Sequence, residues 1–116
     1  MLKLIALISA KPDMSREDFI EYYETNHAPL VKRLLPMIHD YRRNFLDNNL
    51  VPRDVEHPGW DVLTELWFED RIALHAFWAR IQEPDVIAQI RVDEANFLLS
   101  DRTRMLGVEE HVTAST

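Results

Sequence analysis

Apolar residues along the chain form four short runs with the spacing of β-strands, separated by stretches with the spacing of helices. The strand-like runs cover residues 2–9, 38–46, 62–68 and 105–112, and the helical stretches cover 15–35 and 71–99. The order is therefore strand, helix, strand, strand, helix, strand. It predicts an α+β domain with βαββαβ topology, in which a four-stranded antiparallel sheet carries its helices on one face.

Prolines divide the two helical stretches into shorter pieces. Pro29 removes a backbone donor and disfavours helical geometry at Ala28, so we expect the first helix to end or kink at His27. Ser15 and Asp70 precede helical runs and are expected to cap them. The expected helices are 15–27, 29–35, 71–81 and 85–99, with breaks at Pro29, Pro36 and Pro84.

The segment between the second and third strands is rich in Asp, Asn, Pro and Gly and is long for a small domain. It covers residues 47–60. Long ordered loops in small domains are often lids or binding loops, but the same composition also fits the tip of a hairpin. Both interpretations remain open from the sequence.

The first and third strands are apolar on both alternating faces, although the predicted helices cover only one face of the sheet. The uncovered face would be an apolar patch too large for a soluble monomer. The simplest cover is a second copy packed sheet to sheet about a two-fold axis. We therefore expect a homodimer of one domain, residues 1–112, followed by a short polar tail, 113–116.

Composition excludes several classes of protein. The 116 residues include 13 Lys or Arg and 20 Asp or Glu, a net charge of −7 that disfavours a nucleic-acid partner. Cysteine is absent, which excludes disulfides and thiolate chemistry. The only glycines, Gly59 and Gly107, cannot form a phosphate-binding glycine loop.

Targeting and metal signals are also missing from the sequence pattern. The apolar residues 1–10 are too short to span a bilayer and have no signal-peptide cleavage pattern after them. We expect a cytoplasmic protein without a membrane partner. The five histidines show no HxH or HExxH spacing, so neither a metal site nor another cofactor is expected.

Glu65 is a candidate catalytic carboxylate because it interrupts an apolar strand. Leu63 and Trp67 flank it on its own face of that strand. A carboxylate in such a place is either desolvated, with a raised pKa, or paired with a cation or another donor. The expected partners for pairing are Arg42, Arg43 or Arg104, from neighbouring strands.

His27 and Tyr23 are the other catalytic candidates. His27 stands at the predicted helix break, and Tyr23 lies four residues earlier on the same helix face. Such a pair beside a pocket can move a proton or orient a carbonyl group. The alternative is a structural histidine that binds a backbone carbonyl freed by the break.

Residues on the two central strands are the candidates for substrate contact. Tyr41 and His39 share one face of the strand 38–46, but neither face of this strand is clearly apolar, so the inward face stays open. Trp67 and Leu63 are included because they flank Glu65.

Three blocks of sequence resemble the EthD family of dimeric α+β barrel proteins. They are LKLIALISAKPDMSREDFIEYYETNHAPL, DVLTELWFED and DEANFLLSDRTRMLGVEEHV, in that order. The resemblance covers residues 2–112, with 47–60 least matched. It implies a ferredoxin-like protomer, a homodimer, and pockets between sheet and helices. By position, His27 matches the family's His-x-Pro, Tyr23 the preceding aromatic residue, and Glu65 the Glu before Trp-Phe.

The resemblance also implies a class of function. Members are small proteins of catabolic or polyketide-type pathways, and the related barrels include cofactor-independent isomerases, cyclases and dehydratases. We therefore expect proton-transfer chemistry on a largely apolar carbonyl or lactone substrate, with His27, Glu65 and Tyr23 as catalytic residues. Two alternatives are an oxidoreductase or cofactor-independent monooxygenase acting on a phenol, and a non-enzymatic protein that binds a pathway intermediate.

Overall fold

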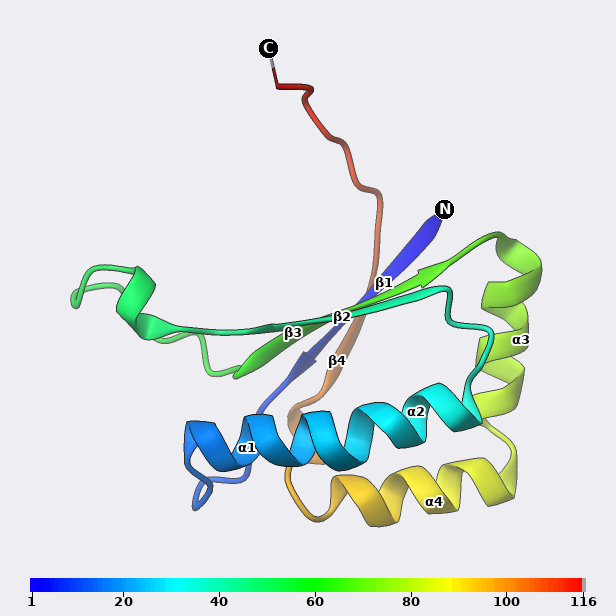
Figure 1. The fold of residues 1–116 in the computed structure, drawn as a ribbon, viewed down its shortest axis with the longest axis horizontal. Helices are drawn as coiled ribbons and strands as arrows, with labels where there is room; N and C mark the ends of the chain where they lie inside the picture. The colour runs from blue at the N-terminus through cyan, green and yellow to red at the C-terminus, as the bar shows by residue number, and fades with distance from the viewer. Residues whose placement is uncertain (116) are drawn as a thin grey trace.

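The computed structural model describes residues 1–115, which form a four-stranded antiparallel sheet with its helices on one side (Figure 1). The predicted fold class is therefore confirmed. The strands are β1 (Leu2–Ile8), β2 (Asp40–Phe45), β3 (Val62–Phe68) and β4 (Arg104–Val108), in the order β2-β3-β1-β4. The α-helices are α1 (Arg16–Tyr22), α2 (Ala28–Leu34), α3 (Arg71–Ile81) and α4 (Pro84–Glu94).

Strict alternation in the two central strands decides which side chains face the helices. In β1 and β3 every second residue is buried beneath the helices, and the register pairs Leu4 with Leu66 and Ala6 with Thr64. Tyr41 of β2 pairs with Leu66, so it shares this face. The pairing thus answers the question left open for β2: Tyr41, Arg43 and Phe45 point toward the helices.

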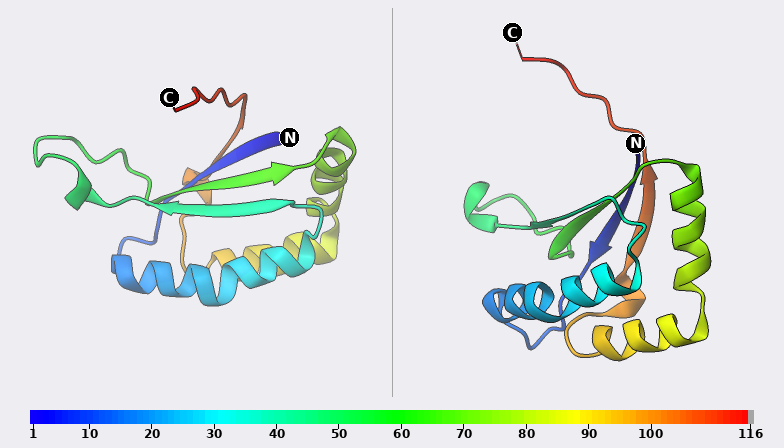
Figure 2. Two further views of the ribbon diagram at one scale, coloured as in Figure 1. Left: turned by 45° about the horizontal axis from the view of Figure 1, so that its top comes forward. Right: turned by 45° about the vertical axis from the view of Figure 1, so that its right-hand side comes forward.

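The opposite face of the sheet, which we call the open face, carries no helix among residues 1–115 (Figure 2). It carries apolar side chains of β1, β3 and β4 around the Lys3–Glu65 ion pair, and Leu106 and Val108 are 43% and 37% exposed there. The predicted two-sided apolar character of β1 and β3 is therefore present. The apolar side chains of this face, placed by register, are Ile5, Leu7, Leu63, Trp67, Leu106 and Val108.

The expected interruption at His27 is present as a change of helix type and not as an end of the helix, because the chain stays helical through Pro29. Between α1 and α2 lies a π-helical turn, Tyr23–His27, and Ala28 keeps helical angles of −61° and −44°. The Ala28 N–H bonds to the carbonyl of Tyr23, five residues back. This wider turn accommodates the proline without ending the helix.

Other boundaries also differ from the prediction, and three of these differences are larger than one residue. The second strand begins at Asp40, the last strand ends at Val108, and α4 ends at Glu94 rather than at residue 99. After α4 the chain turns back and runs beside residues 9–11. Backbone hydrogen bonds there join Lys11 to Phe97 and Leu99 to Ser9. Thr116, the end of the predicted tail 113–116, lies outside the described residues.

The predicted loop 47–60 extends the β2–β3 hairpin beyond the sheet (Figure 2). It contains one 3₁₀ turn, Asn48–Leu50, whose Leu50 side chain is 82% exposed. No residue of this loop lines the cavity that contains His27. In this conformation the segment is a hairpin tip and does not cover that cavity.

Candidate functional site

An apolar cavity lies between the helix-facing side of the sheet and the helices. Its volume is about 100 Å³, and the floor is made by small or apolar side chains of the strands. Its few polar lining groups come from the π turn, β2, β3, α4 and the residue before β4: Tyr23, His27, Tyr41, Thr64, Glu94 and Thr103. A mostly apolar pocket with a few convergent polar groups is the usual form of a small-molecule site.

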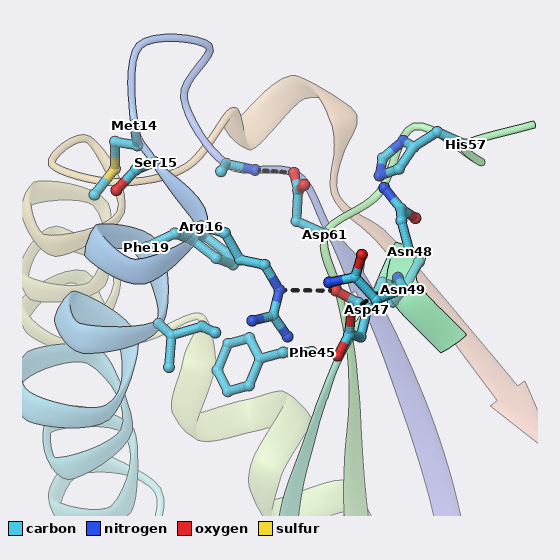
Figure 3. A pocket seen from close by; sticks show the side chains of 13 residues that line it. Met14, Ser15, Arg16, Phe19, Phe45, Asp47, Asn48, Asn49, His57 and Asp61 are labelled. Carbon is cyan, nitrogen blue, oxygen red and sulfur yellow. Dashed lines mark hydrogen bonds between the residues drawn. The ribbon is translucent and has the colours of Figure 1, made fainter. Parts of the chain in front are cut away.

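A second hollow, at the start of α1, is more polar (Figure 3). Two of its charged side chains form hydrogen bonds that hold the hairpin in place. Arg16 Nε donates to the Leu46 carbonyl at 3.1 Å, and Asp61 accepts from the Ala10 N–H at 2.7 Å. These contacts attach the residues that flank the loop 47–60 to α1 and to the segment after β1. We therefore place the candidate site at the apolar cavity.

His27 is held in the cavity wall by a buried carboxylate. His27 is 6% exposed, and its Nδ1 lies 2.6 Å from Oδ2 of Asp93 on α4. The Tyr22 hydroxyl donates to the other oxygen of Asp93 at 2.8 Å. No hydrogen-bond partner for Nε2 occurs among residues 1–115. The imidazole is therefore fixed through one nitrogen, and the other remains available for chemistry.

Burial lowers the pKa of His27 below its ordinary value of 6.5, although Asp93 acts in the opposite direction. As the pH falls, His27 of the unfolded chain is therefore protonated at a higher pH than His27 of the folded chain. Stability supplied by neutral His27 is complete above pH 6.5 and declines as pH falls from 6.5 to the folded pKa.

We expect the His27 ring signals in an NMR titration to show a midpoint below 6.5. Urea unfolding at several pH values should show stability falling in the same range. A His27→Gln variant should lack that part of the pH dependence. A midpoint at or above 6.5 would contradict the neutral imidazole.

Tyr23 supplies a buried hydroxyl beside the imidazole. It is 0% exposed, its ring meets His27 edge-on at 4.8 Å between centroids, and its hydroxyl lies 2.7 Å from Thr64 Oγ1. The Tyr41 hydroxyl is 3.2 Å away. Burial raises the pKa of both tyrosines, so the hydroxyls keep their protons and can donate hydrogen bonds.

Glu94 places a carboxyl group in the same cavity, next in sequence to the residue that holds His27. It is half-buried, and burial together with the neighbouring Asp93 charge raises its pKa. Raised carboxyl pKa values favour acid–base roles near neutral pH. The site therefore contains a second titratable group that the sequence analysis did not select.

Glu65 does not lie in this cavity, because its strand parity points it to the open face. Its oxygens lie 3.4 Å from Lys3 Nζ and 2.9 Å from Asn44 Nδ2, which donates to it. Hydrogen bonds from Asn44, Lys3 and Trp67 lower the pKa of this carboxyl. The raised pKa that desolvation predicted is wrong, and pairing holds instead, with Lys3 rather than an arginine.

The predicted substrate-contacting residues are divided between the two faces. Tyr41 lines the cavity. Trp67 and Leu63 lie on the open face with Glu65. His39 precedes β2 outside the cavity, where its Nδ1 is 3.2 Å from Glu69 Oε1 and its side chain is 44% exposed. The structure thus brings together His27, Tyr23 and Tyr41, and none of the other predicted site residues.

Asp93 is the functional candidate whose signal was present in the sequence and missed. Val86, Ile90 and Phe97 form the buried stripe of this helical segment, and Asp93 shares their spacing. An acidic residue on an apolar stripe needs a buried partner. That pattern points to a paired carboxylate, although it does not name the partner.

No group of three or more potential metal ligands of the kind His, Asp and Glu occurs in the part of the chain that the structure describes. Within the same residues, every helix is too short or too polar for a membrane-spanning segment.

Comparison with known proteins gives a family and a fold. Solved structures that resemble the chain include an ethyl tert-butyl ether D (EthD) family protein from Bacillus halodurans, at 19% identity and TM-score 0.63, covering 96% of this chain and 100% of that one. A dimeric protein of unknown function with a ferredoxin-like fold, from Bacteroides fragilis, matches at 14% identity and TM-score 0.57, with 94% and 95% covered.

An antibiotic biosynthesis monooxygenase matches at 19% identity and TM-score 0.54, with 97% of this chain and 100% of that one covered. No curated protein sequence matches this chain. The model of the EthD domain matches residues 11–101, which is most of the chain. This chain therefore belongs to the EthD family.

Proposed function

We propose that this protein is an enzyme that moves a proton, without a cofactor, on a small and largely apolar carbonyl or lactone substrate. One observation carries the proposal: a buried imidazole with a lowered pKa, fixed by Asp93, forms part of the wall of an apolar cavity. A neutral imidazole in a dry site can accept a proton from carbon next to a carbonyl group.

Four residues of the site have a role in this reaction. His27 Nε2 takes the proton, and Asp93 fixes the ring through Nδ1 and stabilises its positive charge after transfer. The hydroxyls of Tyr23 and Tyr41 donate toward the oxygen on which negative charge develops. Glu65 receives no role in the proton transfer because its carboxylate lies on the open face.

Hydrogen exchange tests the proposal without knowledge of the full reaction. The protein is incubated in D₂O with small cyclic ketones and lactones, and loss of the proton next to the carbonyl is followed by NMR. Faster exchange than in buffer is expected for ligands that enter the cavity. Absence of exchange for every compound that native mass spectrometry shows bound would contradict the proposal.

A neutral buried histidine would equally accept the proton of a phenol, and one similar structure is described as a monooxygenase. The second candidate function is therefore oxidation of a phenolic substrate by O₂. An oxygen electrode distinguishes it: consumption of O₂ with a phenol, and no added metal or flavin, would favour this reaction.

The non-enzymatic alternative receives divided support. It expects both His27 and Glu65 to be used in structural contacts away from a cavity. Glu65 meets that description, but His27 lines the cavity and keeps one ring nitrogen without a partner among residues 1–115.

A pathway of catabolic or polyketide type, and a cytoplasmic location, remain predictions.

We further propose that the open face is the interface of a homodimer. Its apolar side chains lie on all of β1, β3 and β4, and a similar structure is described as dimeric. A second copy of the same face would cover them by two-fold symmetry.

A Leu106→Glu variant should dissociate this dimer, because it places two unpaired charges in an apolar interface. We expect the dissociation constant to rise by about 100-fold or more. Sedimentation or light scattering at micromolar concentration measures it, with Ile72→Glu as control, since Ile72 is 80% exposed on α3. A wild-type protein that is monomeric at this concentration would overturn the interface.

A further inference from the structure

The cavity has polar groups on the β4 side that the proposed proton transfer does not use. Thr103, just before β4, lines the cavity, and its Oγ1 is buried without a hydrogen-bond partner among residues 1–115. Buried hydroxyl groups are normally paired, because an unpaired one loses the hydrogen bonds it made with water. This atom is therefore positioned to be satisfied by something that enters the cavity.

Glu94 is the second such group. It lines the same cavity from α4, and its carboxyl oxygens make no hydrogen bond or ion pair with other residues in the range 1–115. Its carboxylate oxygens accept hydrogen bonds, and the Thr103 hydroxyl can donate one as well as accept one. Thr103 and Glu94 together offer donors and acceptors to a neutral oxygen-containing group.

Ala6 separates this side of the cavity from the tyrosine side. The register places Thr64 of β3 opposite Ala6, and Ala6 opposite Met105 of β4. Neighbouring strands lie about 4.8 Å apart, so β3 and β4 are separated by about 10 Å. The small side chain of Ala6 leaves the space above β1 open, and the cavity occupies it.

The dimensions fit one six-membered ring. The cavity volume of about 100 Å³ is of the same order as the roughly 150 Å³ engineered cavity that holds benzene. A ring with oxygens at opposite positions, plus a hydrogen bond of about 2.8 Å at each end, spans roughly 10–11 Å. That length is of the same order as the separation of β3, where the Tyr23 hydroxyl lies against Thr64, from β4, which Thr103 precedes.

We infer that Thr103 and Glu94 form a second oxygen-binding subsite, and that the substrate is a single-ring compound with oxygen-containing groups at opposite positions. One oxygen binds at Tyr23, Tyr41 and His27, and the other at Thr103 and Glu94. The inference rests on the proposed function, because it takes the His27 cavity as the substrate site.

A pair of ring compounds of nearly equal shape tests the subsite. Hydroquinone has two oxygens at opposite positions, and 4-methylphenol replaces one of them with a methyl group. Titration calorimetry under anaerobic conditions should give hydroquinone at least about tenfold higher affinity, because the methyl group leaves the subsite unpaired. Equal affinities, or no binding of either compound to the wild type, would overturn the inference.

Two variants assign the effect to the residues. Thr103→Val keeps the shape, and it should reduce the preference to about threefold or less while the affinity for 4-methylphenol stays the same. Ala6→Leu fills the space above β1 and should abolish binding of both compounds, with circular dichroism to show that the fold is retained. Retained preference in Thr103→Val, or binding by folded Ala6→Leu, would refute the subsite.

The outcomes also separate this inference from the proposed function. Absence of proton exchange with the binding preference intact rejects the reaction and keeps the subsite. Exchange on ring ketones that is equally fast with and without the second oxygen, and unaffected by Thr103→Val, rejects the subsite and keeps the reaction.

Discussion

Replacing His27 with alanine is expected to slow proton exchange on a bound carbonyl compound by about 10²–10⁴-fold, the usual contribution of a positioned general base. The imidazole is the only proposed proton acceptor with a fixed orientation, since Asp93 lies 2.6 Å from its Nδ1. Rates should be compared at saturating ligand, so that weaker binding does not contribute. A His27→Ala variant with full exchange activity would reject the assignment.

Two further variants show whether the loss comes from chemistry or from the fold. Asn26→Ala changes the exposed neighbour of His27 and should retain the wild-type rate. Asp93→Asn keeps the imidazole but weakens its positioning and the stabilisation of its charge, so exchange should fall and its pH profile should shift. An Asp93→Asn variant with an unchanged rate and pH profile would show that this carboxylate is only structural.

Strand β3 and helix α3 could be predicted to the residue because local signals agree at their ends. Polar and turn-forming residues precede Val62, and Asp70 caps α3 by accepting from the Ala73 N–H at 2.9 Å. Pro84 ends the pattern on the other side. Such elements need little tertiary information to be located.

The turn at His27 could not be predicted in the same way, because the rule for proline is local. It correctly identifies the lost N–H of Pro29, but it does not show how the helix adjusts. Here five residues widen into a π turn, and packing of Tyr23 and His27 against the sheet and α4 stabilises it. The same turn directs both side chains to the cavity.

Glu65 was selected together with His27 because strand parity does not say which face the helices cover. Parity places Glu65 with Leu63 and Trp67, and Thr64 with the opposite set. Either face of β3 was apolar enough to be the inner one. Only the register of the sheet and the packing of α4 show that Asp93, 66 positions from His27, is the carboxylate that meets it.

The largest expected loss of stability comes from Phe97→Ala, which should lower the free energy of unfolding by about 3–5 kcal/mol. Phe97 is 0% exposed and follows α4 into the space between α1 and the sheet. Its ring lies 4.8 Å from Tyr22, 5.6 Å from Phe19 and 5.0 Å from His27, between centroids. Alanine leaves a cavity at the point where these rings meet.

Urea unfolding followed by circular dichroism measures the effect, and Val92→Ala is the matched control because Val92 is 71% exposed on α4. The control should change stability by about 0.5 kcal/mol or less. Because Phe97 also contacts the His27 ring, the folded Phe97→Ala variant should lose proton exchange as well. A loss of less than about 1 kcal/mol would show that the rings close the gap left by Phe97, and that this cluster does not hold His27 in place.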